Sequence, residues 1–253
     1  MSWSATIVPI GGPVIGADFI DRFLRAVAAS TLSEWLPGEA SRILDLSRDS
    51  LTVLQPMLAA GHTVVHVDVN PRRPDIGRNP DSSGALMIVQ ADRLTLDWLA
   101  DASVDAVVAE GGTLSEALAA EVTLESVHRV LRPGGRLLLA VDSLVAGLGR
   151  LADAGRWAEL ADVPAADVVL IPEPDGHVSR CFWPEELHGM LAAAGFAVEW
   201  IRPRSVLAEE TVVRALQQDP KQLDALVTTE LALESQRQGE SVGRRLVASA
   251  RRI

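Results

Sequence analysis

Two reactive side chains are scarce or missing from the 253 residues: there is one cysteine, Cys181, and no tyrosine. A single cysteine cannot form a disulfide within the chain, and it excludes a zinc site built from several thiolates. The lack of tyrosine excludes mechanisms that use a tyrosine base or nucleophile. His62 and His66 lie four apart within an expected strand rather than on one helix face, so we predict no metal site.

Lysine is also nearly missing: the sequence has one lysine, Lys221, and twenty-two arginines. The 34 acidic residues outnumber the 23 basic ones, which gives a net charge of −11. An acidic surface repels phosphate backbones, so we expect no nucleic-acid partner. Four arginines near the C-terminus are interpreted as a solvated strand edge and tail: Arg244, Arg245, Arg251 and Arg252.

No apolar run approaches the roughly 20 residues that a helix needs to cross a bilayer. The segment from Met1 to Gly16 carries no early positive charge, and Gly11-Gly12-Pro13 interrupts its apolar residues. This pattern differs from that of a signal peptide. We therefore predict a soluble, cytoplasmic protein without a membrane partner.

The first part of the chain alternates short apolar strands with helices. Strands are predicted over 42–46, 63–67, 86–90, 104–109 and 136–141, and helices over 17–36, 51–60 and 114–131. The strands are apolar at consecutive positions, as strands buried on both faces are. This order favours a parallel sheet with helices on both sides, with ligands beyond the carboxyl ends of the strands.

The second part is less regular. We predict helices over 144–160, 184–194 and 219–237, strands over 196–201 and 243–250, and loops over 71–84 and 162–178. The first loop is rich in proline, glycine, aspartate and arginine, and the second contains proline and aspartate. Because no linker divides the chain, the pattern favours one domain over two.

Several stretches, taken in order, resemble the class I S-adenosylmethionine (SAM)-dependent methyltransferases of the small-molecule type. They are Arg42–Leu46 followed by Gly61–Asp68, then Gln90-Ala91-Asp92, Ser103–Val108 and the segment His128–Leu139 with its Leu-Arg-Pro-Gly-Gly. Weaker matches follow at 184–196 and 244–251. The resemblance implies a Rossmann-like α/β fold with a seven-stranded, mostly parallel sheet, helices on both faces and an antiparallel last strand. It also implies one domain over 1–253, with a helical cap (17–40), a cofactor-binding half (42–142) and a substrate-side half (143–253).

The resemblance assigns three carboxylates to the cofactor SAM. Asp68 would accept hydrogen bonds from the ribose hydroxyls, Asp92 would accept one from the adenine amino group, and Asp45 would face the ammonium of the methionine moiety. A second interpretation stays open for each of them, because an aspartate after a strand is also a common turn and cap residue.

The turn after the first strand departs from the family. Its glycines, which let the backbone approach the cofactor, would fall at Ser47, Asp49 and Leu51, and the turn contains no glycine. In one interpretation Asp49 binds the ammonium of SAM, Arg48 its carboxylate, and Ser47 lies beside them. In the other, the loop has been lost as a cofactor site.

Three residues are candidates for contact with the methyl acceptor. Glu110 and Asp142 end the fourth and fifth strands, at the edge where the family places its substrate, and either carboxylate is suited to take a proton. Gly111-Gly112 permits close approach of a ligand. His177 lies in a loop that is placed as a lid would be, and it is a candidate base. Each carboxylate is equally suited to capping the following helix.

Three functions follow from these observations. The first is a SAM-dependent methyltransferase that methylates an oxygen, nitrogen or carbon atom of an unidentified small molecule. The second is a non-catalytic binding or scaffolding protein on the same fold, which the glycine-free loop motivates. The third is an enzyme that uses the fold for other chemistry, since fold alone does not decide activity. The oligomeric state stays open.

Overall fold

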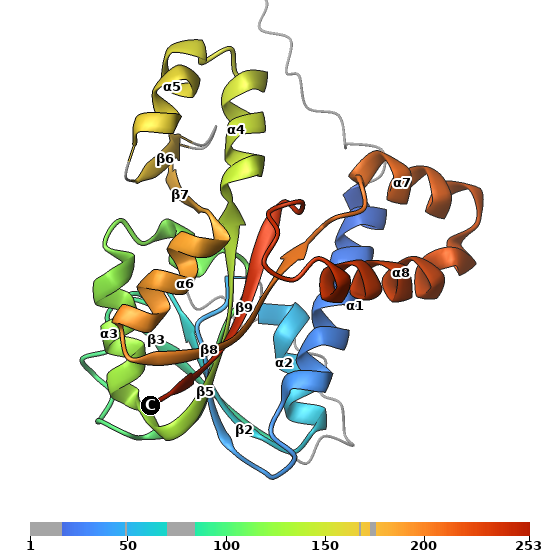
Figure 1. The fold of residues 1–253 in the computed structure, drawn as a ribbon. Coiled ribbons are helices and arrows are strands. Elements are labelled where there is room, and N and C mark those ends of the chain that lie inside the picture. The colour runs from blue at the N-terminus through green and yellow to red at the C-terminus, as the bar shows by residue number, and fades with distance from the viewer. Residues whose placement is uncertain (1–16, 49, 70–83, 167, 173–175) are drawn as a thin grey trace, which may run out of the picture.

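The computed structural model describes residues 17–48, 50–69, 84–166, 168–172 and 176–253. Five parallel strands form the centre of its sheet, in the spatial order β3-β2-β1-β4-β5 (Figure 1). They are β1 (Arg42–Asp45), β2 (Thr63–Asp68), β3 (Ala85–Gln90), β4 (Val104–Ala109) and β5 (Leu131–Ser143). Because the strands are parallel, their carboxyl ends meet at one edge of the sheet.

The last strand, β9 (Arg245–Arg252), is antiparallel to β5 on one side and to β8 (Phe196–Arg204) on the other. With the five central strands, β9 and β8 make the predicted seven-stranded, mostly parallel sheet with an antiparallel last strand. The fold class is therefore confirmed. The start of β9 and the end of β8 both lie at the carboxyl edge of the parallel strands.

A hairpin extends the sheet to nine strands among the described residues. It consists of β6 (Val169–Pro172) and β7 (Val178–Phe182), and β7 pairs with the end of β5. We had expected a loop over most of this segment. The strand β6 has only two buried positions, Val169 and Ile171, alternating with exposed ones, which is too short a pattern to distinguish from a loop.

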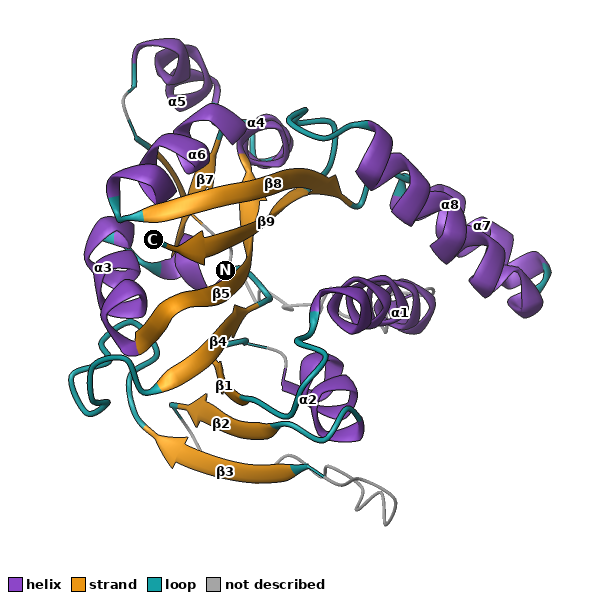
Figure 2. Cartoon of the chain, turned by 60° about the horizontal axis from the view of Figure 1, so that its bottom comes forward, coloured by secondary structure: helices purple, strands orange, loops and turns teal. Residues whose placement is uncertain are grey.

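Helices cover both faces of the sheet (Figure 2). On one face pack α1 (Ala17–Trp35) and α2 (Ser50–Ala59), and on the other α3 (Ala120–Val130) and α6 (Pro184–Ala193). Strand β5 is apolar at consecutive positions because both of its faces are covered by helices. Its Leu138 and Ala140 pack toward α1 and α2, whereas Leu137, Leu139 and Val141 pack toward α3 and α6.

Two predicted helices have different bounds in the structure. The helix expected over 114–131 is a 3-10 turn, η1 (Thr113–Glu116), followed by α3 from Ala120. Leu118 and Val122, which have the spacing of core residues in a helix over 114–131, are 67% and 56% exposed and lie outside the core. The helix expected over 144–160 is divided into α4 (Leu144–Asp153) and α5 (Trp157–Asp162), because Gly155 adopts a positive φ of 67° between them.

The C-terminal helices pack against α1, and α8 also contacts β8 (Figure 1). The helix predicted from residue 219 comprises the turn η3 (Pro220–Gln222) and α8 (Leu223–Gln236), and α7 (Glu209–Gln218) precedes it. Their buried residues meet Phe23 and Val27 of α1. A short turn, η2 (Val163–Ala165), completes the elements. Over the described ranges, no helix has the length and apolarity that a membrane crossing requires.

Candidate functional site

Two adjoining cavities lie at the carboxyl edge of the sheet. The first, here called the α1 cavity, has a volume of about 340 Å³ and lies between α1, the loop after β4 and the strands β8 and β9. The second, the hairpin cavity, has about 410 Å³ and reaches the β6–β7 hairpin. Arg48, Gly111 and Arg245 line both cavities, so the two are lobes of one cleft.

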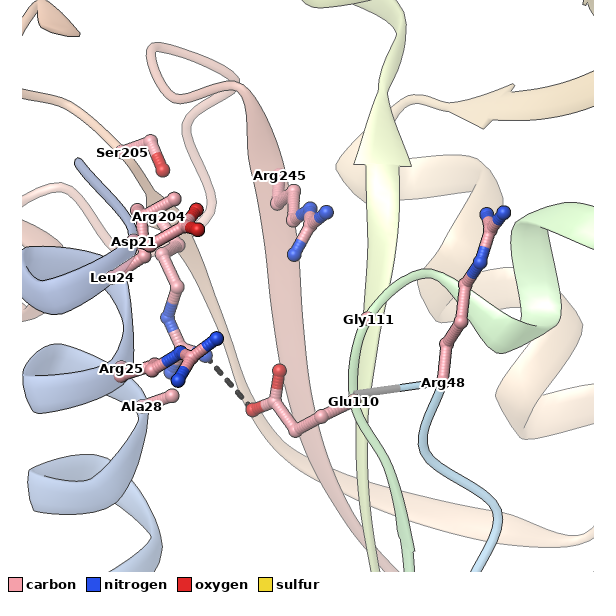
Figure 3. A pocket seen from close by; sticks show the side chains of 10 residues that line it. All are labelled: Asp21, Leu24, Arg25, Ala28, Arg48, Glu110, Gly111, Arg204, Ser205 and Arg245. Atoms are coloured by element: carbon pink, nitrogen blue, oxygen red, sulfur yellow. Dashed lines mark hydrogen bonds and ion pairs between the residues drawn. The ribbon is translucent and has the colours of Figure 1, made fainter. Parts of the chain in front are cut away.

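Glu110 lies in the wall of the α1 cavity and forms an ion pair with Arg204. The Nη1 atom of Arg204 donates to Oε1 of Glu110 at 2.8 Å (Figure 3). Arg204 also donates to Glu234 at 3.2 Å and to the hydroxyl of Thr31 at 3.0 Å. The side chains of Arg204 and Glu110 are only 3% and 8% exposed, so this pair is shielded from water.

Desolvation acts in opposite directions on the pKa values of Arg204 and Glu234, which belong to the same ion-pair network as Glu110. Desolvation opposes the charge on Arg204, but the neighbouring Glu110 and Glu234 outweigh it and raise the pKa of Arg204. Desolvation raises the pKa of Glu234 to about 7, with Arg204 lowering it and the nearby Glu230 and Glu110 adding to the rise. Arg204 is therefore permanently charged, whereas Glu234 titrates near neutrality.

The raised pKa of Glu234 predicts a pH dependence of stability. A carboxyl with pKa 4.5 outside the fold and about 7 inside it binds a proton more tightly when folded. Its contribution is complete below about pH 4.5 and is lost as the pH rises through about 7. We expect the free energy of unfolding in urea to fall less steeply between pH 5 and 8 in Glu234→Gln than in wild type. Equal slopes would contradict this assignment.

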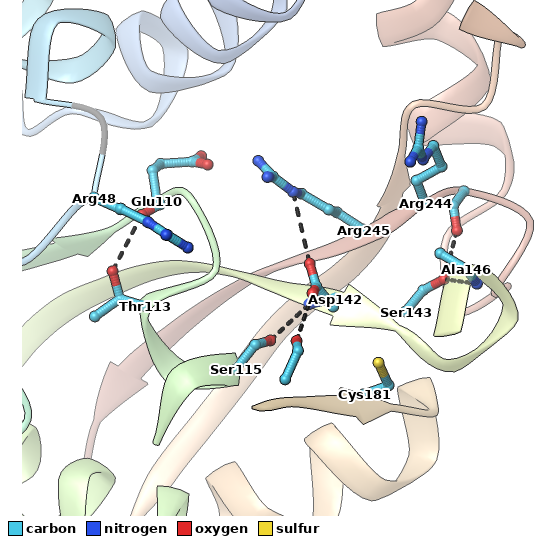
Figure 4. A network of polar contacts seen from close by, with 12 residues as sticks. Arg48, Glu110, Thr113, Ser115, Asp142, Ser143, Ala146, Cys181, Arg244 and Arg245 are labelled. Carbon is cyan, nitrogen blue, oxygen red and sulfur yellow. Dashed lines mark hydrogen bonds and ion pairs between the residues drawn. The ribbon is translucent and has the colours of Figure 1, made fainter. Parts of the chain in front are cut away.

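Asp142, the second predicted carboxylate, lies in the hairpin cavity with His177. Its Oδ2 accepts a hydrogen bond from the hydroxyl of Ser179 at 2.6 Å and two from Arg150 at 3.2 and 3.3 Å. Its Oδ1 lies 3.9 Å from Nε of Arg245 (Figure 4). The structure thus brings Asp142 and His177 to one cavity and places Glu110 in the adjoining one.

Two predicted cofactor residues are turned into the protein at the end of β1. Asp45 is fully buried, its Oδ2 lies 2.7 Å from Nδ1 of His66, and its Oδ1 accepts from the backbone of Ser47 at 3.0 Å. The Ser47 hydroxyl accepts from the backbone N–H of Glu110 at 2.9 Å. These bonds hold the turn after β1 against the end of β4. The predicted contacts of Asp45 and Ser47 with SAM stay predictions.

The side chain of Arg48, in this turn, reaches the cleft. It is 53% exposed, and its guanidinium lies 2.5 Å from Glu116 of η1. Arg93 approaches the same carboxylate at 3.8 Å and donates to the carbonyl of Ser47 at 3.4 Å. Sequence reasoning missed Glu116 and Arg93, although Arg93 directly follows the predicted Asp92. Asp49 lies outside the described residues.

Asp68 and Asp92 follow neighbouring strands. Asp68 ends β2, is half-buried, and stands opposite Gln90 of β3 in the sheet register. Asp92 is exposed, and its Oδ1 accepts from the backbone N–H of Leu94 at 2.8 Å, the turn-forming contact that we had left open for it. Within the described ranges, no three His, Cys, Asp or Glu side chains gather as a metal site would require.

Arg245 corrects an interpretation of the C-terminal arginines. Its side chain is 41% exposed, as expected, but it lines both cavities, and β9 is paired on both sides rather than being an edge strand. The reason is topological: β9 runs opposite to β5, and its first residue therefore lies at the carboxyl edge. Arg25 of α1 and Arg204 at the end of β8 also line the α1 cavity, and no sequence motif marks either of them.

A match to a known protein family covers the strands that build this cleft. The family model described as a methyltransferase domain matches residues 44–139, from β1 into β5. Over these residues the chain is similar to methyltransferase domains. The matched segment contains Glu110 and the turn with Arg48, whereas the arginines of β8 and β9 lie beyond it.

Proteins named as methyltransferases are similar to this chain in sequence. The chain is 34% identical over 149 residues to proteins of Mycobacterium tuberculosis and Mycobacterium bovis that are named uncharacterised methyltransferases. The match covers 58% of this chain and 59% of each relative, so it spans somewhat more than half of their length.

Solved structures share the fold over most of their length. A SAM-dependent methyltransferase from Mesorhizobium loti is 16% identical, with 89% of this chain and 98% of that one covered and a TM-score of 0.56. The Burkholderia thailandensis 1,6-didemethyltoxoflavin-N1-methyltransferase, solved with S-adenosylhomocysteine, is 18% identical, with 98% and 93% covered and a TM-score of 0.53. The [4+2]-cyclase SpnF is 19% identical, with 93% of each chain covered and a TM-score of 0.51. At these identities the likeness shows the fold.

Proposed function

We propose that this protein is a SAM-dependent methyltransferase that acts on a small molecule. The observation that carries the proposal is the two-lobed cleft at the carboxyl edge of the sheet, lined by acidic and arginine side chains from segments far apart in the sequence. Its lobes of about 340 and 410 Å³ have the volume of small-molecule sites. The edge is also where sheets of this type bind their ligands.

The polar groups at this edge fit SAM as cofactor. Asp68, a carboxylate at the end of β2, has the chemistry to accept two hydrogen bonds from a ribose diol. Arg48 offers a guanidinium to the methionine carboxylate, and the exposed Asp92 offers an acceptor to the adenine amino group. Gly111 and Gly112 have φ angles of 80° and 81°, which admit a ligand close to the backbone after β4. When bound, SAM supplies an electrophilic methyl group on a sulfonium.

The chain's own contribution to such a reaction is alignment and proton removal. In our proposal Glu110 and Asp142 orient the acceptor from the two lobes, since each carboxylate is fixed by arginines at 2.8–3.3 Å. His177, which lines the hairpin cavity, takes up the proton that the substrate loses on methylation, where one is released. The roles of Glu110 and Asp142 extend predictions made from strand ends, and the role of His177 extends the prediction made from its loop.

A transfer assay separates this function from the two alternatives. Methyl-labelled SAM is incubated with the full chain and small molecules that carry hydroxyl, amine or acidic carbon groups. We expect label in at least one product, together with stoichiometric S-adenosylhomocysteine. Saturable binding of S-adenosylhomocysteine without label in any product would support the non-catalytic protein, or chemistry of another kind as in the cyclase neighbour.

The glycine-free turn gives a further prediction. If Arg48 binds the methionine carboxylate and Asp49 the ammonium, replacing both by glycine removes two charge-assisted contacts. We expect the Kd for S-adenosylhomocysteine to rise at least tenfold in Arg48→Gly/Asp49→Gly, measured by calorimetry on folded protein. Equal or tighter binding would show instead that these side chains obstruct the cofactor, as in a loop that has lost its function.

A further inference from the structure

The two carboxylate oxygens of Asp142, near the end of β5, have different surroundings. Oδ2 accepts a hydrogen bond from the hydroxyl of Ser179 at 2.6 Å and two from Arg150 at 3.2 and 3.3 Å. Because a carboxylate oxygen has about two lone-pair sites, these donors leave no room for another on Oδ2. A ligand that donates a hydrogen bond to Asp142 must therefore use Oδ1.

Oδ1 lies beside Gly112 and Arg245, which both line the hairpin cavity. Arg245 forms an ion pair with Oδ1 at 3.9 Å, which is longer than a hydrogen bond (Figure 4). A Cβ atom at position 112 would lie 3.7 Å from Oδ1, so the glycine leaves this side of the oxygen uncovered. Over the described residues, no group donates a hydrogen bond to Oδ1. Oδ1 is thus the atom of Asp142 that can accept one from a ligand in the cavity.

The position of Asp142 is fixed from both sides of β5. Its backbone N–H donates to the hydroxyl of Ser115 at 2.8 Å. On the other side β7 pairs with β5, with Cys181 opposite Asp142, and Ser179 lies two residues earlier on β7. Ser179 is buried, and its hydroxyl makes the shortest of the hydrogen bonds to the carboxylate. Rotation of the carboxylate about its Cβ–Cγ bond would break this hydrogen bond, so Ser179 fixes the direction in which Oδ1 points.

We infer that Ser179 is a positioning residue whose hydrogen bond to Oδ2 orients Asp142, so that Oδ1 accepts a hydrogen bond from an O–H or N–H group of the methyl acceptor. The inference rests on the proposed function, in which Asp142 orients the acceptor. The substrate class is thus a small alcohol, phenol or amine whose donor hydrogen lies in the hairpin cavity. An ether or a tertiary amine lacks that hydrogen and does not form the bond.

The test uses phenol and aniline as probes that donate a hydrogen bond, with anisole and N,N-dimethylaniline as counterparts that lack the hydrogen. Each is titrated into the full chain with and without S-adenosylhomocysteine, and the amide NMR signals of Gly111 and Gly112 give the Kd. We expect phenol or aniline to bind saturably and its counterpart to bind about fivefold or more weakly. The carboxyl carbon signal of Asp142 should shift with the donor probe and not with its counterpart.

Ser179→Ala tests the positioning residue, with Ser249→Ala as the matched control. Ser249 is also a buried serine whose hydroxyl donates to a carboxylate, that of Glu199 at 2.7 Å, and neither of these two residues lines the hairpin cavity. We expect probe binding to weaken about fivefold or more in Ser179→Ala, because Oδ1 is then less well aimed, and to change by less than about twofold in Ser249→Ala.

Asp142→Asn shows whether Ser179 acts through Asp142. Ser179 and Arg150 are donors and hold the amide oxygen of asparagine on their side, which turns its NH₂ group toward the cavity. We therefore expect the preference for phenol over anisole to disappear, and Ser179→Ala to have less than about a twofold further effect in this background. Because asparagine has the shape of aspartate, this variant keeps the inference testable if Ser179→Ala does not fold.

Three results overturn the inference. One is the absence of saturable binding by phenol and by aniline, with and without S-adenosylhomocysteine. The second is binding of each probe and its counterpart with equal affinity. The third is a loss in Ser179→Ala that is equalled in Ser249→Ala or repeated in the Asp142→Asn background, which would show only a structural role. These titrations need no methyl transfer, so the expected binding without transfer would reject the proposed function while upholding the roles of Ser179 and Asp142.

Discussion

Replacing Arg204 by methionine is expected to lower the free energy of unfolding by about 3–5 kcal/mol. The substitution leaves Glu110 and Glu234 buried without their shared cation, and uncompensated buried charges are costly. Denaturant titration monitored by circular dichroism measures the change. Arg237→Met is the matched control, since its pair with Glu240 is half-exposed and worth at most about 1 kcal/mol.

A combined variant keeps this prediction testable if Arg204→Met does not fold. Changing Glu110 and Glu234 to glutamine together with Arg204→Met removes all three charges, so we expect it to be more stable than Arg204→Met alone. If Arg204→Met lies within about 1 kcal/mol of wild type, the buried network does not hold β8 and β4 together as described.

The second large effect is expected at Asp68, for cofactor affinity rather than stability. Losing a charge-assisted hydrogen bond costs on the order of 1.5–3 kcal/mol, so Asp68→Ala should raise the Kd for S-adenosylhomocysteine roughly ten- to a hundredfold. Asp97→Ala provides the control, because Asp97 is an exposed carboxylate between β3 and β4. An unchanged Kd in folded Asp68→Ala would reject its assignment to the ribose.

The central sheet could be predicted because strands that are buried on both faces appear in the sequence as continuous apolar runs. Leu137 to Val141 are apolar without interruption, since alternate residues pack under helices on opposite faces. The hairpin β6–β7 and the helix α7 lack such a mark. Helix α7 buries only Val212 and Leu216, and it does so against α1, which no local pattern reveals.

The residues of the site likewise fall into those that the sequence predicts and those that it does not. Glu110 and Asp142 were predicted from their position after a strand, and both line the cleft. Asp45 also lies at the end of a strand, yet one of its carboxylate oxygens contacts His66 of β2 inside the protein. Arg25, Arg204 and Arg245 were missed because their approach depends on how α1, β8 and β9 are arranged in space.

Calorimetric titration of the wild-type chain with S-adenosylhomocysteine tests the central claim most directly. If the carboxyl edge of the sheet is a cofactor site, the titration gives saturable binding near one molecule per chain, weakened in Asp68→Ala and unaltered in Asp97→Ala. A folded wild-type protein that shows no saturable binding of either S-adenosylhomocysteine or SAM would contradict the account.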